Sequence, residues 1–386
     1  MRILQLISTI GYYGAESVVC SLARQLRAQG HESMVCILTR SSRYDDTIVV
    51  KCRKEGIPAF VIDCSGRLDW KAIRQLRRLL REHPVDIVHA HNYKSNLYAW
   101  LATRGSGIPL AATCHNWTGS TASLRLYASL DRMVLRGFTK IVAVSAPVAE
   151  ELRRACVADD RISVIRNGID TEVFRSAVAA FPRESPSQIT IGTVCRLVRE
   201  KGVADLLHAA RSLLKTHPDL RFLIAGDGPY RPEFEALAAY LGIAAKVRFL
   251  GFQSDMPAVY ASMDIFTLPS YNEGLPVSVL EAMAAGKPVV ASRAGALPEV
   301  INETVGSLIA PGDREALVRS LGRLIDDPAL MREQGANASR MVRQRFDAQE
   351  MARQYVEVYE DALHSVRGSR RESAPPPHAS TSRGTL

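Results

Sequence analysis

Short apolar runs alternate with helical patterns along almost the whole chain of 386 residues. Runs such as Arg2–Ile7 and Ile87–Ala90 end in turns, and segments with apolar residues at helical spacing follow them. This alternation is typical of a parallel sheet wrapped by helices. The pattern stops at Ala177–Ser187, a stretch that contains two prolines, and restarts at Ile189–Val194. We therefore predict an α/β protein with two similar domains joined at this break.

The expected domain boundaries follow from that break. The first domain should cover residues 1–180 and the second residues 187–345. A closing helix over 346–366 follows, and we expect it to pack back on the first domain. The final stretch, 367–386, is of low complexity and predicts a disordered tail.

Charge is distributed unevenly between the two halves. Residues 1–185 contain 26 Lys and Arg against 17 Asp and Glu, whereas residues 186–386 contain 23 of each. The excess favours an anionic partner for the first half, such as a membrane face, a lipid phosphate or nucleic acid, and an incidental solvated surface is the alternative. No apolar run approaches the roughly 18 residues of a membrane-spanning helix. The seven cysteines include no C-x-x-C pair, so we expect reduced cytoplasmic thiols and neither disulfides nor a zinc site.

The stretch PSYNEGLPVSVLEAMAAGKPVVAS, residues 269–292, contains two glutamates in different settings. Glu273 lies in a loop after an apolar run. Glu281 is the only charge in Val277–Ala285, which predicts a buried helix with Pro276 in its first turn and Gly286 at its end. A carboxylate on such a helix is unfavourable without a partner. Because no cation lies one helical turn away, the partner must be remote backbone, a remote side chain or a ligand.

A glycine motif, GYYGAES, follows the first expected strand and opens the first helix. Gly11 and Gly14 would let the backbone approach a ligand, and a helix N-terminus can hold an anion. A glycine turn after a first strand is also a common structural feature, so both interpretations remain open.

Histidines end two expected strands of the first domain. His115 follows Leu110–Cys114 and continues into polar residues, at the strand end where open α/β sheets place their ligand crevice. His89 and His91 end the preceding strand and compete for any role. An ordinary structural histidine is the alternative for each.

Two cations follow the first strand of the second domain, in VCRLVREKG. Arg196 and Lys201 can converge on one diphosphate, although two loop cations are often only solvated. The chain has no Asp-x-Asp pair and no His/Asp cluster at ligand spacing, which disfavours a catalytic metal. Two basic amphipathic helices, expected over Trp70–Glu82 and Leu124–Arg136, are candidates for an anionic membrane surface, and packed surface helices are the alternative.

Taken in order, these motifs resemble those of the family 4 retaining glycosyltransferases. The series is GAE, the strand-end His115, RNGID, CRLVREKG, GDGP, FLGF and the two-glutamate stretch, and it covers about residues 1–365. The resemblance implies the GT-B fold, in which two Rossmann-like domains with parallel sheets face a central cleft. The first motif, GYYGAE, departs from the adjacent glycines of many members, so the shape of that loop stays open.

The resemblance also implies site roles. It places the transferred sugar at Glu273, the ribose at Glu281 and the donor diphosphate at Arg196 and Lys201, with His115 near the reacting sugar. Catalytic residues would be His115, Glu273, Arg196 and Lys201. Donor-binding residues would be Gly14, Arg196, Lys201, Phe252, Gln253, Glu273, Gly274, Leu275, Pro276, Val277 and Glu281.

The implied activity is retaining transfer of a sugar from a nucleotide-diphosphate donor, UDP-sugar before GDP-sugar, to an acceptor hydroxyl. We expect a saccharide or lipid-linked acceptor in cell-envelope or extracellular polysaccharide and glycolipid synthesis. No metal, cofactor or nucleic acid is expected. The expected location is cytoplasmic, at the inner face of the membrane through the basic first half. A sugar-nucleotide epimerase and a non-catalytic nucleotide-sugar binder are the alternatives.

Overall fold

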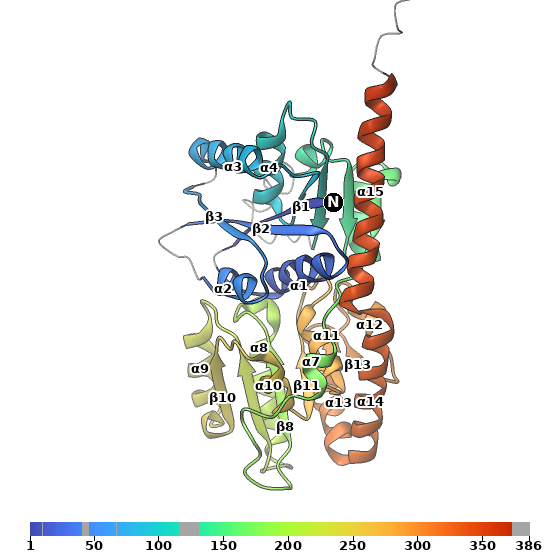
Figure 1. The fold of residues 1–386 in the computed structure, drawn as a ribbon. Coiled ribbons are helices and arrows are strands. Elements are labelled where there is room, and N and C mark those ends of the chain that lie inside the picture. Colours follow the sequence, from blue (N-terminus) through green and yellow to red (C-terminus); the bar gives the residue numbers. More distant parts are fainter. Residues whose placement is uncertain (10, 41–45, 67, 116–130, 373–386) are drawn as a thin grey trace, which may run out of the picture.

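The computed structural model describes residues 1–9, 11–40, 46–66, 68–115 and 131–372. Figure 1 shows two lobes, one above the other, each built on a sheet covered by helices. We call residues 1–167 with α15 the first lobe, and residues 171–345 the second lobe. Every strand pairing within the described residues is parallel, as predicted from the alternating pattern.

The first sheet has the described strand order β3-β2-β1-β4-β5-β6-β7. The chain crosses from one side of β1 to the other between β3 and β4, so the carboxyl ends of β1 and β4 border a crevice. The strands are β1 Arg2–Ser8, β2 Glu32–Thr39, β3 Ala59–Asp63, β4 Ile87–Ala90, β5 Leu110–Cys114, β6 Lys140–Ala143 and β7 Ile162–Val164. The helices are α1 Gly14–Ala28, α2 Thr47–Lys54, α3 Trp70–Glu82, α4 Tyr93–Thr103 and α6 Ala146–Arg154, with a 3₁₀ turn, η2, at Asp159–Arg161.

The second sheet has the described order β10-β9-β8-β11-β12-β13, with the same reversal between β10 and β11. Its strands are β8 Thr190–Val194, β9 Arg221–Ala225, β10 Val247–Gly251, β11 Ile265–Leu268, β12 Val289–Ser292 and β13 Gly306–Ile309. Its helices are α7 Glu172–Arg175, α8 Val203–Leu213, α9 Arg231–Tyr240, α10 Met256–Ala261, α11 Val277–Ala284, α12 Leu297–Val300, α13 Arg314–Asp326 and α14 Pro328–Arg345, with 3₁₀ turns η3 Arg199–Lys201 and η4 Ala244–Lys246.

The last helix, α15 (Ala348–Glu372), returns from the second lobe and runs along the first (Figure 1). Tyr355 and Tyr359 are 1% and 0% exposed, and both reach the first sheet. The Tyr359 hydroxyl hydrogen-bonds with His89 Nδ1 at 2.8 Å and accepts from Gln5 Nε2 at 3.3 Å, and the Tyr355 hydroxyl lies 2.8 Å from Thr113 Oγ1. The first sheet is therefore covered on this side by the end of the chain.

Two expectations about boundaries need correction. The stretch 177–187 is not the crossing point, because Arg221 of β9 donates to the carbonyls of Phe181 and Pro182 and holds the stretch on the second lobe. The chain crosses earlier, where Ile169 pairs with Asp347. The closing helix ends at Glu372, six residues beyond the expected position, because Arg and Glu favour the helix and one Gly does not stop it.

Helix α2, Thr47–Lys54, lies between β2 and β3 and was not expected from the sequence, because its apolar face is only Ile48, Val49 and Cys52.

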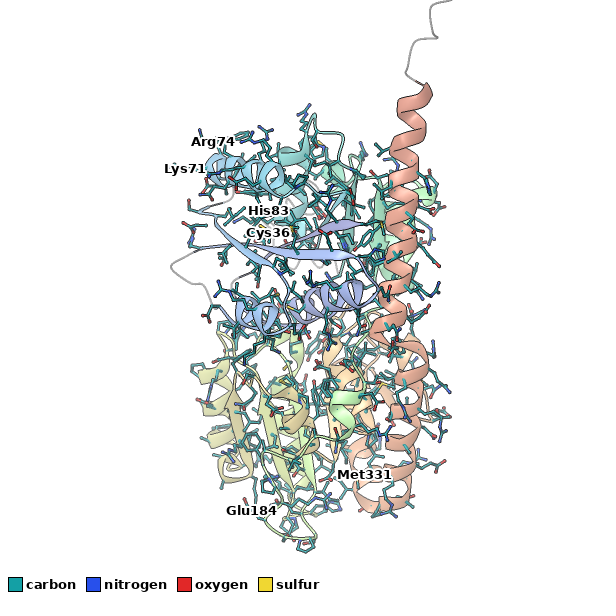
Figure 2. The ribbon with its side chains drawn as sticks, in the orientation of Figure 1. Cys36, Lys71, Arg74, His83, Glu184 and Met331 are labelled. Carbon is teal, nitrogen blue, oxygen red and sulfur yellow. The ribbon has the colours of Figure 1, made fainter. Side chains whose placement is uncertain are left out.

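Most of the expected basic helix over residues 124–136 lies outside the described residues. Helix α3 buries Ile73, Leu76, Leu79 and Leu80, and Figure 2 shows Lys71 and Arg74 directed away from the first lobe. Within the part of the chain that the structure describes, no helix is long and apolar enough to span a membrane.

Candidate active site

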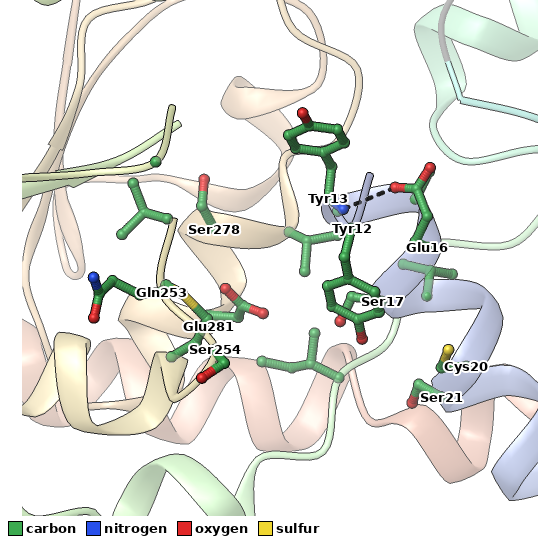
Figure 3. A pocket seen from close by; sticks show the side chains of 18 of the residues that line it. Tyr12, Tyr13, Glu16, Ser17, Cys20, Ser21, Gln253, Ser254, Ser278 and Glu281 are labelled. Atoms are coloured by element: carbon green, nitrogen blue, oxygen red, sulfur yellow. Dashed lines mark hydrogen bonds between the residues drawn. The ribbon is translucent and has the colours of Figure 1, made fainter. Parts of the chain in front are cut away.

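A cleft of about 1060 Å³ lies between the two lobes. The loop before α1 and helices α1 and α2 line it from the first lobe, and the loops after β8 and β10 with helix α11 line it from the second. Figure 3 shows Tyr12, Tyr13 and Ser17 on one side and Gln253, Ser278 and Glu281 on the other. Nine of the eleven residues expected to bind a donor line this cleft, namely Gly14, Arg196, Lys201, Phe252, Gln253, Glu273, Pro276, Val277 and Glu281.

The N-termini of α1 and α11 face each other across the cleft. A Cβ atom added to Gly14 would lie 3.5 Å from the Cβ of Val277. The α1 terminus is fixed by Glu16, whose Oε2 accepts from the Tyr13 backbone N–H at 3.0 Å, and Pro276 caps α11 without a side-chain hydrogen bond. Because the first amides of a helix have no carbonyl partner within it, two helix ends present donors and positive dipole ends to the same space.

Glu273 and Lys201 form an ion pair at the floor of the cleft. Lys201 Nζ donates to Glu273 Oε1 at 2.6 Å, and the Glu273 side chain is 5% exposed. The loop that carries Glu273 is fixed on its other side, because Tyr271 donates to Asp205 at 2.7 Å and Arg314 donates to the same carboxylate at 2.6 Å. Lys201 therefore holds the Glu273 carboxylate directly, and Asp205 with Arg314 fixes Tyr271 of the same loop.

Arg196 differs from the nearby cations Arg199 and Lys201 because it forms no ion pair among the described residues. It is exposed and lines the cleft. Arg199, three residues later, pairs instead with Glu233 at 3.1 Å and lies outside the cleft lining. An exposed guanidinium that lines the same cleft as the two helix ends, and that pairs with no carboxylate of the described residues, is placed to receive an anionic ligand.

Glu281 receives its hydrogen bond from a residue that the sequence did not point to. The hydroxyl of Tyr260, on α10, donates to Glu281 Oε2 at 2.8 Å, and Tyr260 is fully buried. Burial raises the pKa of Glu281 to about 7, while the Tyr260 hydrogen bond and the charge of Lys51 act to lower it. The remote partner expected for this carboxylate is thus a phenol, and the second carboxylate oxygen stays available to a ligand.

Phe252 and Gln253 border the outer end of the cleft. The Phe252 ring is 44% exposed, and Gln253 Nε2 donates to the Leu250 carbonyl at 2.8 Å. The exposed ring can stack on a planar base, and the neighbouring amide can form a hydrogen bond with that base.

Gly274 and Leu275 lie behind the cleft and do not line it. The Gly274 carbonyl accepts from the Ala296 N–H at 3.1 Å, and the Leu275 carbonyl accepts from Asn167 Nδ2 at 3.1 Å. Asn167 belongs to the RNGID motif, so the cross-lobe hydrogen bond gives that motif a role in supporting the glutamate loop. These two residues are thus outside the lining of the cleft, and the expectation that they contact the donor stays a prediction.

His115 is also separate from the lining of the cleft. It follows β5, and its ring stacks on His91 with centroids 6.1 Å apart. Its Nε2 is buried and has no hydrogen-bond partner within the described structure, and burial lowers the pKa of His115 to about 4. His89 and His91 are fully buried parts of the first lobe and do not compete for a place at the surface. His115 is therefore a neutral imidazole with an unused nitrogen.

The described residues include no group of three or more His, Cys, Asp and Glu placed to hold a metal ion. The lining of the cleft includes Arg196 and Lys201, the N-termini of α1 and α11 and the carboxylates of Glu273 and Glu281, beside further charged side chains such as Lys51. Such a set binds a diphosphate and a polyhydroxylated group side by side.

Comparison with known proteins matches both lobes to glycosyltransferases. Residues 12–173 match the family described as Glycosyltransferase Family 4, and residues 178–341 match Glycosyl transferases group 1. The MMP alpha-(1->4)-mannosyltransferase of Mycolicibacterium hassiacum is 33% identical over 74% of this chain and 73% of its own length. The 2-deoxystreptamine glucosyltransferase of Streptomyces kanamyceticus is 29% identical over 75% and 82%. The crystal structure of Anabaena HepE in complex with UDP and glucose has a TM-score of 0.81 at 22% identity, over 93% of this chain and 99% of that one.

Proposed function

Because the chain belongs to the family 4 glycosyltransferases, we propose that it transfers a hexose from a UDP-sugar to an acceptor hydroxyl with retention of configuration and without a metal. The observation that carries the proposal is the exposed Arg196, which forms no ion pair among the described residues and lines the same cleft as two helix N-termini and the Glu273–Lys201 pair. The complexes of HepE with UDP and with UDP-glucose support a uridine nucleotide as the donor for this GT-B fold.

The reaction breaks the bond between the sugar C1 and the diphosphate oxygen, and the electron pair leaves with the phosphate. Arg196, Lys201 and the amides at the start of α1 and α11 stabilise the charge that develops there. The acceptor oxygen attacks C1 from the face that the phosphate leaves, and the leaving phosphate oxygen takes the acceptor proton. Glu273, close to the sugar, stabilises positive charge at the ring electrostatically.

The experiment is a panel of UDP-, GDP- and ADP-sugars tested for thermal stabilisation and hydrolysis, followed by NMR of the glycosidic product. A UDP-sugar should stabilise the protein most, and the product should keep the α configuration of the donor in the presence of EDTA. Inverted product or complete loss of activity with EDTA contradicts the retaining or the metal-independent part. Conversion of the donor sugar to its epimer without an acceptor supports an epimerase instead.

Arg196→Ala tests the role of the diphosphate contacts, and Arg199→Ala is its matched control. The first variant should lose about 10²–10³-fold in turnover, the scale of one preorganised charge. Arg199 is an exposed arginine in the same loop that is paired away from the cleft, so its removal should leave turnover within a few-fold. Equal activity of the two variants argues against the role of Arg196.

We further propose that the acceptor is a saccharide or lipid-linked molecule used in building cell-envelope or extracellular polysaccharide. The support is the charge of the first lobe, and in particular α3. This helix exposes Lys71, Arg74 and Arg78 on one side, beside Trp70, which is 61% exposed. Cations next to an exposed indole suit the surface of a bilayer that contains anionic lipids.

A further inference from the structure

Helix α2 brings a lysine to the first-lobe side of the cleft. Lys51 Nζ lies 4.2 Å from the centroid of the Tyr12 ring, and both side chains line the cleft together with Glu281. Among the described residues no carboxylate forms an ion pair with Lys51, although it is only partly exposed. The ring of Tyr12 thus holds an ammonium group at the cleft without neutralising it.

Lys51 lines the same cleft as the carboxylate of Glu281 in the opposite lobe. Burial raises the pKa of Glu281, and the positive charge of Lys51 acts to lower it; burial also raises the pKa of Tyr12, and the charge of Glu281 adds to that rise. Both charge effects cross the cleft, because Lys51 and Tyr12 belong to the first lobe and Glu281 to α11. Glu281 is the one charged side chain of α11, because the other residues of this helix are apolar apart from Ser278.

A vicinal diol needs both kinds of partner. Each hydroxyl donates one hydrogen bond, which a carboxylate accepts, and keeps lone pairs that only a donor can satisfy. Glu281 supplies the acceptor, and its remaining neighbour Tyr260 already donates to it. An ammonium across the cleft supplies the missing donor and offsets the carboxylate charge.

From this geometry we propose that Lys51 binds the ribose hydroxyl oxygens of the donor opposite Glu281, so that the ribose is recognised by both lobes, with Tyr12 holding Lys51 in place. This inference rests on the proposed function, since it assigns a second contact to the nucleotide of the same donor. It makes ribose binding dependent on the approach of the two lobes.

The test compares UDP with 2′,3′-dideoxy-UDP, which lacks both hydroxyls, by calorimetry at pH 8 on wild type, Lys51→Met and Arg53→Met. Methionine keeps the aliphatic stem of lysine, and Arg53 is an exposed cation on the same helix that does not line the cleft. Lys51→Met should weaken UDP binding about tenfold and dideoxy-UDP binding less than about twofold, as expected for a lost charge-assisted hydrogen bond. Arg53→Met should leave both affinities unchanged, and all three proteins should unfold at the same temperature.

The outcomes separate the two proposals. Equal losses for the two nucleotides would mean that Lys51 acts on the diphosphate or on the field of the cleft, and this would overturn the inference, as would unchanged UDP affinity. If wild type binds no UDP at all while remaining folded, the proposed function fails and this inference with it. Tyr12→Leu should reproduce part of the Lys51→Met effect, again only with the ribose hydroxyls present.

Discussion

The ammonium of Lys201 donates to the carboxylate of Glu273 across 2.6 Å, which joins the turn after β8 to the loop before α11. Each group is the other's partner in the structure, although each was assigned from the sequence to a different part of the ligand. A donor that binds Lys201 through its phosphates must therefore share this cation with Glu273. The pair fixes the position of the ammonium relative to the carboxylate before any ligand enters.

Lys201→Met should lower the free energy of unfolding by about 2 kcal/mol, less than the roughly 3–5 kcal/mol of a fully buried pair because Lys201 keeps some exposure. Turnover should fall by about 10²–10³-fold. The double variant Lys201→Met/Glu273→Gln should recover most of the stability and none of the activity, since it removes the unpaired buried charge. Urea unfolding and initial rates measure both; a double variant as unstable as Lys201→Met contradicts the pairing.

Gly295→Ala should damage the glutamate loop. Gly295 has φ +51, and an added Cβ would lie 1.7 Å from the Glu273 carbonyl oxygen, so the loop must move. We expect about 1–3 kcal/mol of lost stability and a large loss of turnover. Gly242→Ala is the control, because Gly242 has φ +70 and no atom lies within 4 Å of the new Cβ. This variant should lose stability but keep its activity. Thermal unfolding and rate assays distinguish the two, and an active Gly295→Ala variant contradicts the argument.

Binding of UDP-glucose should strengthen as the pH rises through about 7. The pKa of Glu281 is raised to about 7 by burial, and only the ionised form accepts both ribose hydroxyls. The charged or titratable groups around it are Tyr260 from α10, Lys51 from α2 and Tyr12 before α1. UDP-glucose is the suitable probe because its diphosphate has no free terminal phosphate to titrate. Calorimetry across pH 5.5–8.5, a range of about three units around that pKa, gives the profile.

Tyr260→Phe should move that profile to higher pH and weaken binding at pH 8 by about tenfold, because the carboxylate loses its donor. The exposed Tyr240 is the control, and Tyr240→Phe should change neither the profile nor the affinity.

In the absence of ligand, the free energy of unfolding should change with pH in the direction opposite to ligand binding. A carboxyl whose folded pKa exceeds its unfolded value contributes stability below about pH 4.5 that is lost as the pH rises towards 7. An unshifted binding profile in Tyr260→Phe would falsify the role of the hydroxyl.

His115 should act as a neutral imidazole. Its pKa is lowered to about 4 by burial, so between about pH 5 and 9 its charge does not change. Because the family resemblance implies a place for His115 near the reacting sugar, where its free nitrogen would orient or stabilise that sugar, His115→Ala should lower kcat by about 10²-fold with a small change in the KM of the donor. The acid limb of the wild-type rate profile, set by Glu281, should persist in His115→Asn. Disappearance of that limb in His115→Asn would show that the histidine titrates in the working range.

Wild type should bind vesicles that contain anionic lipid and should not bind neutral ones, and binding should weaken as salt is raised. Lys71→Glu/Arg74→Glu should abolish this binding while leaving hydrolysis of the donor intact, since both residues lie far from the cleft lining. Lys215→Glu/Lys246→Glu, the same charge change on the second lobe, is the control. Vesicle sedimentation reports the result, and salt-insensitive binding contradicts the electrostatic mechanism.

The alternating pattern was sufficient to predict both sheets, because parallel strands buried on both faces need continuous apolar runs. The two-glutamate stretch likewise predicted α11, because Pro276 precedes and Gly286 follows the apolar segment in the sequence, and the helix begins and ends next to them in the structure. These features depend on local sequence. They could be recognised without knowing which segments meet.

What the sequence did not reveal depends on contacts between distant segments. Tyr260 is 21 residues from Glu281 and has no motif around it, so its hydrogen bond could not be predicted. Lys51 lies on a short helix with a small apolar face, and its relation to Glu281 arises only when the lobes meet. The crossing at Ile169 was predicted too late in the chain because proline marks a loop but does not reveal which lobe holds it.

The position of α15 has a consequence for synthesis of the protein. Gln5 and Tyr359 are 354 residues apart in sequence, yet they form one buried hydrogen-bonded cluster. During translation the strands of the first lobe leave the ribosome before those of the second lobe, but α15, which covers them, follows the second lobe. One face of the first sheet therefore stays uncovered until α15 has emerged. The second lobe, whose strands and helices are contiguous, can fold before the first lobe is complete.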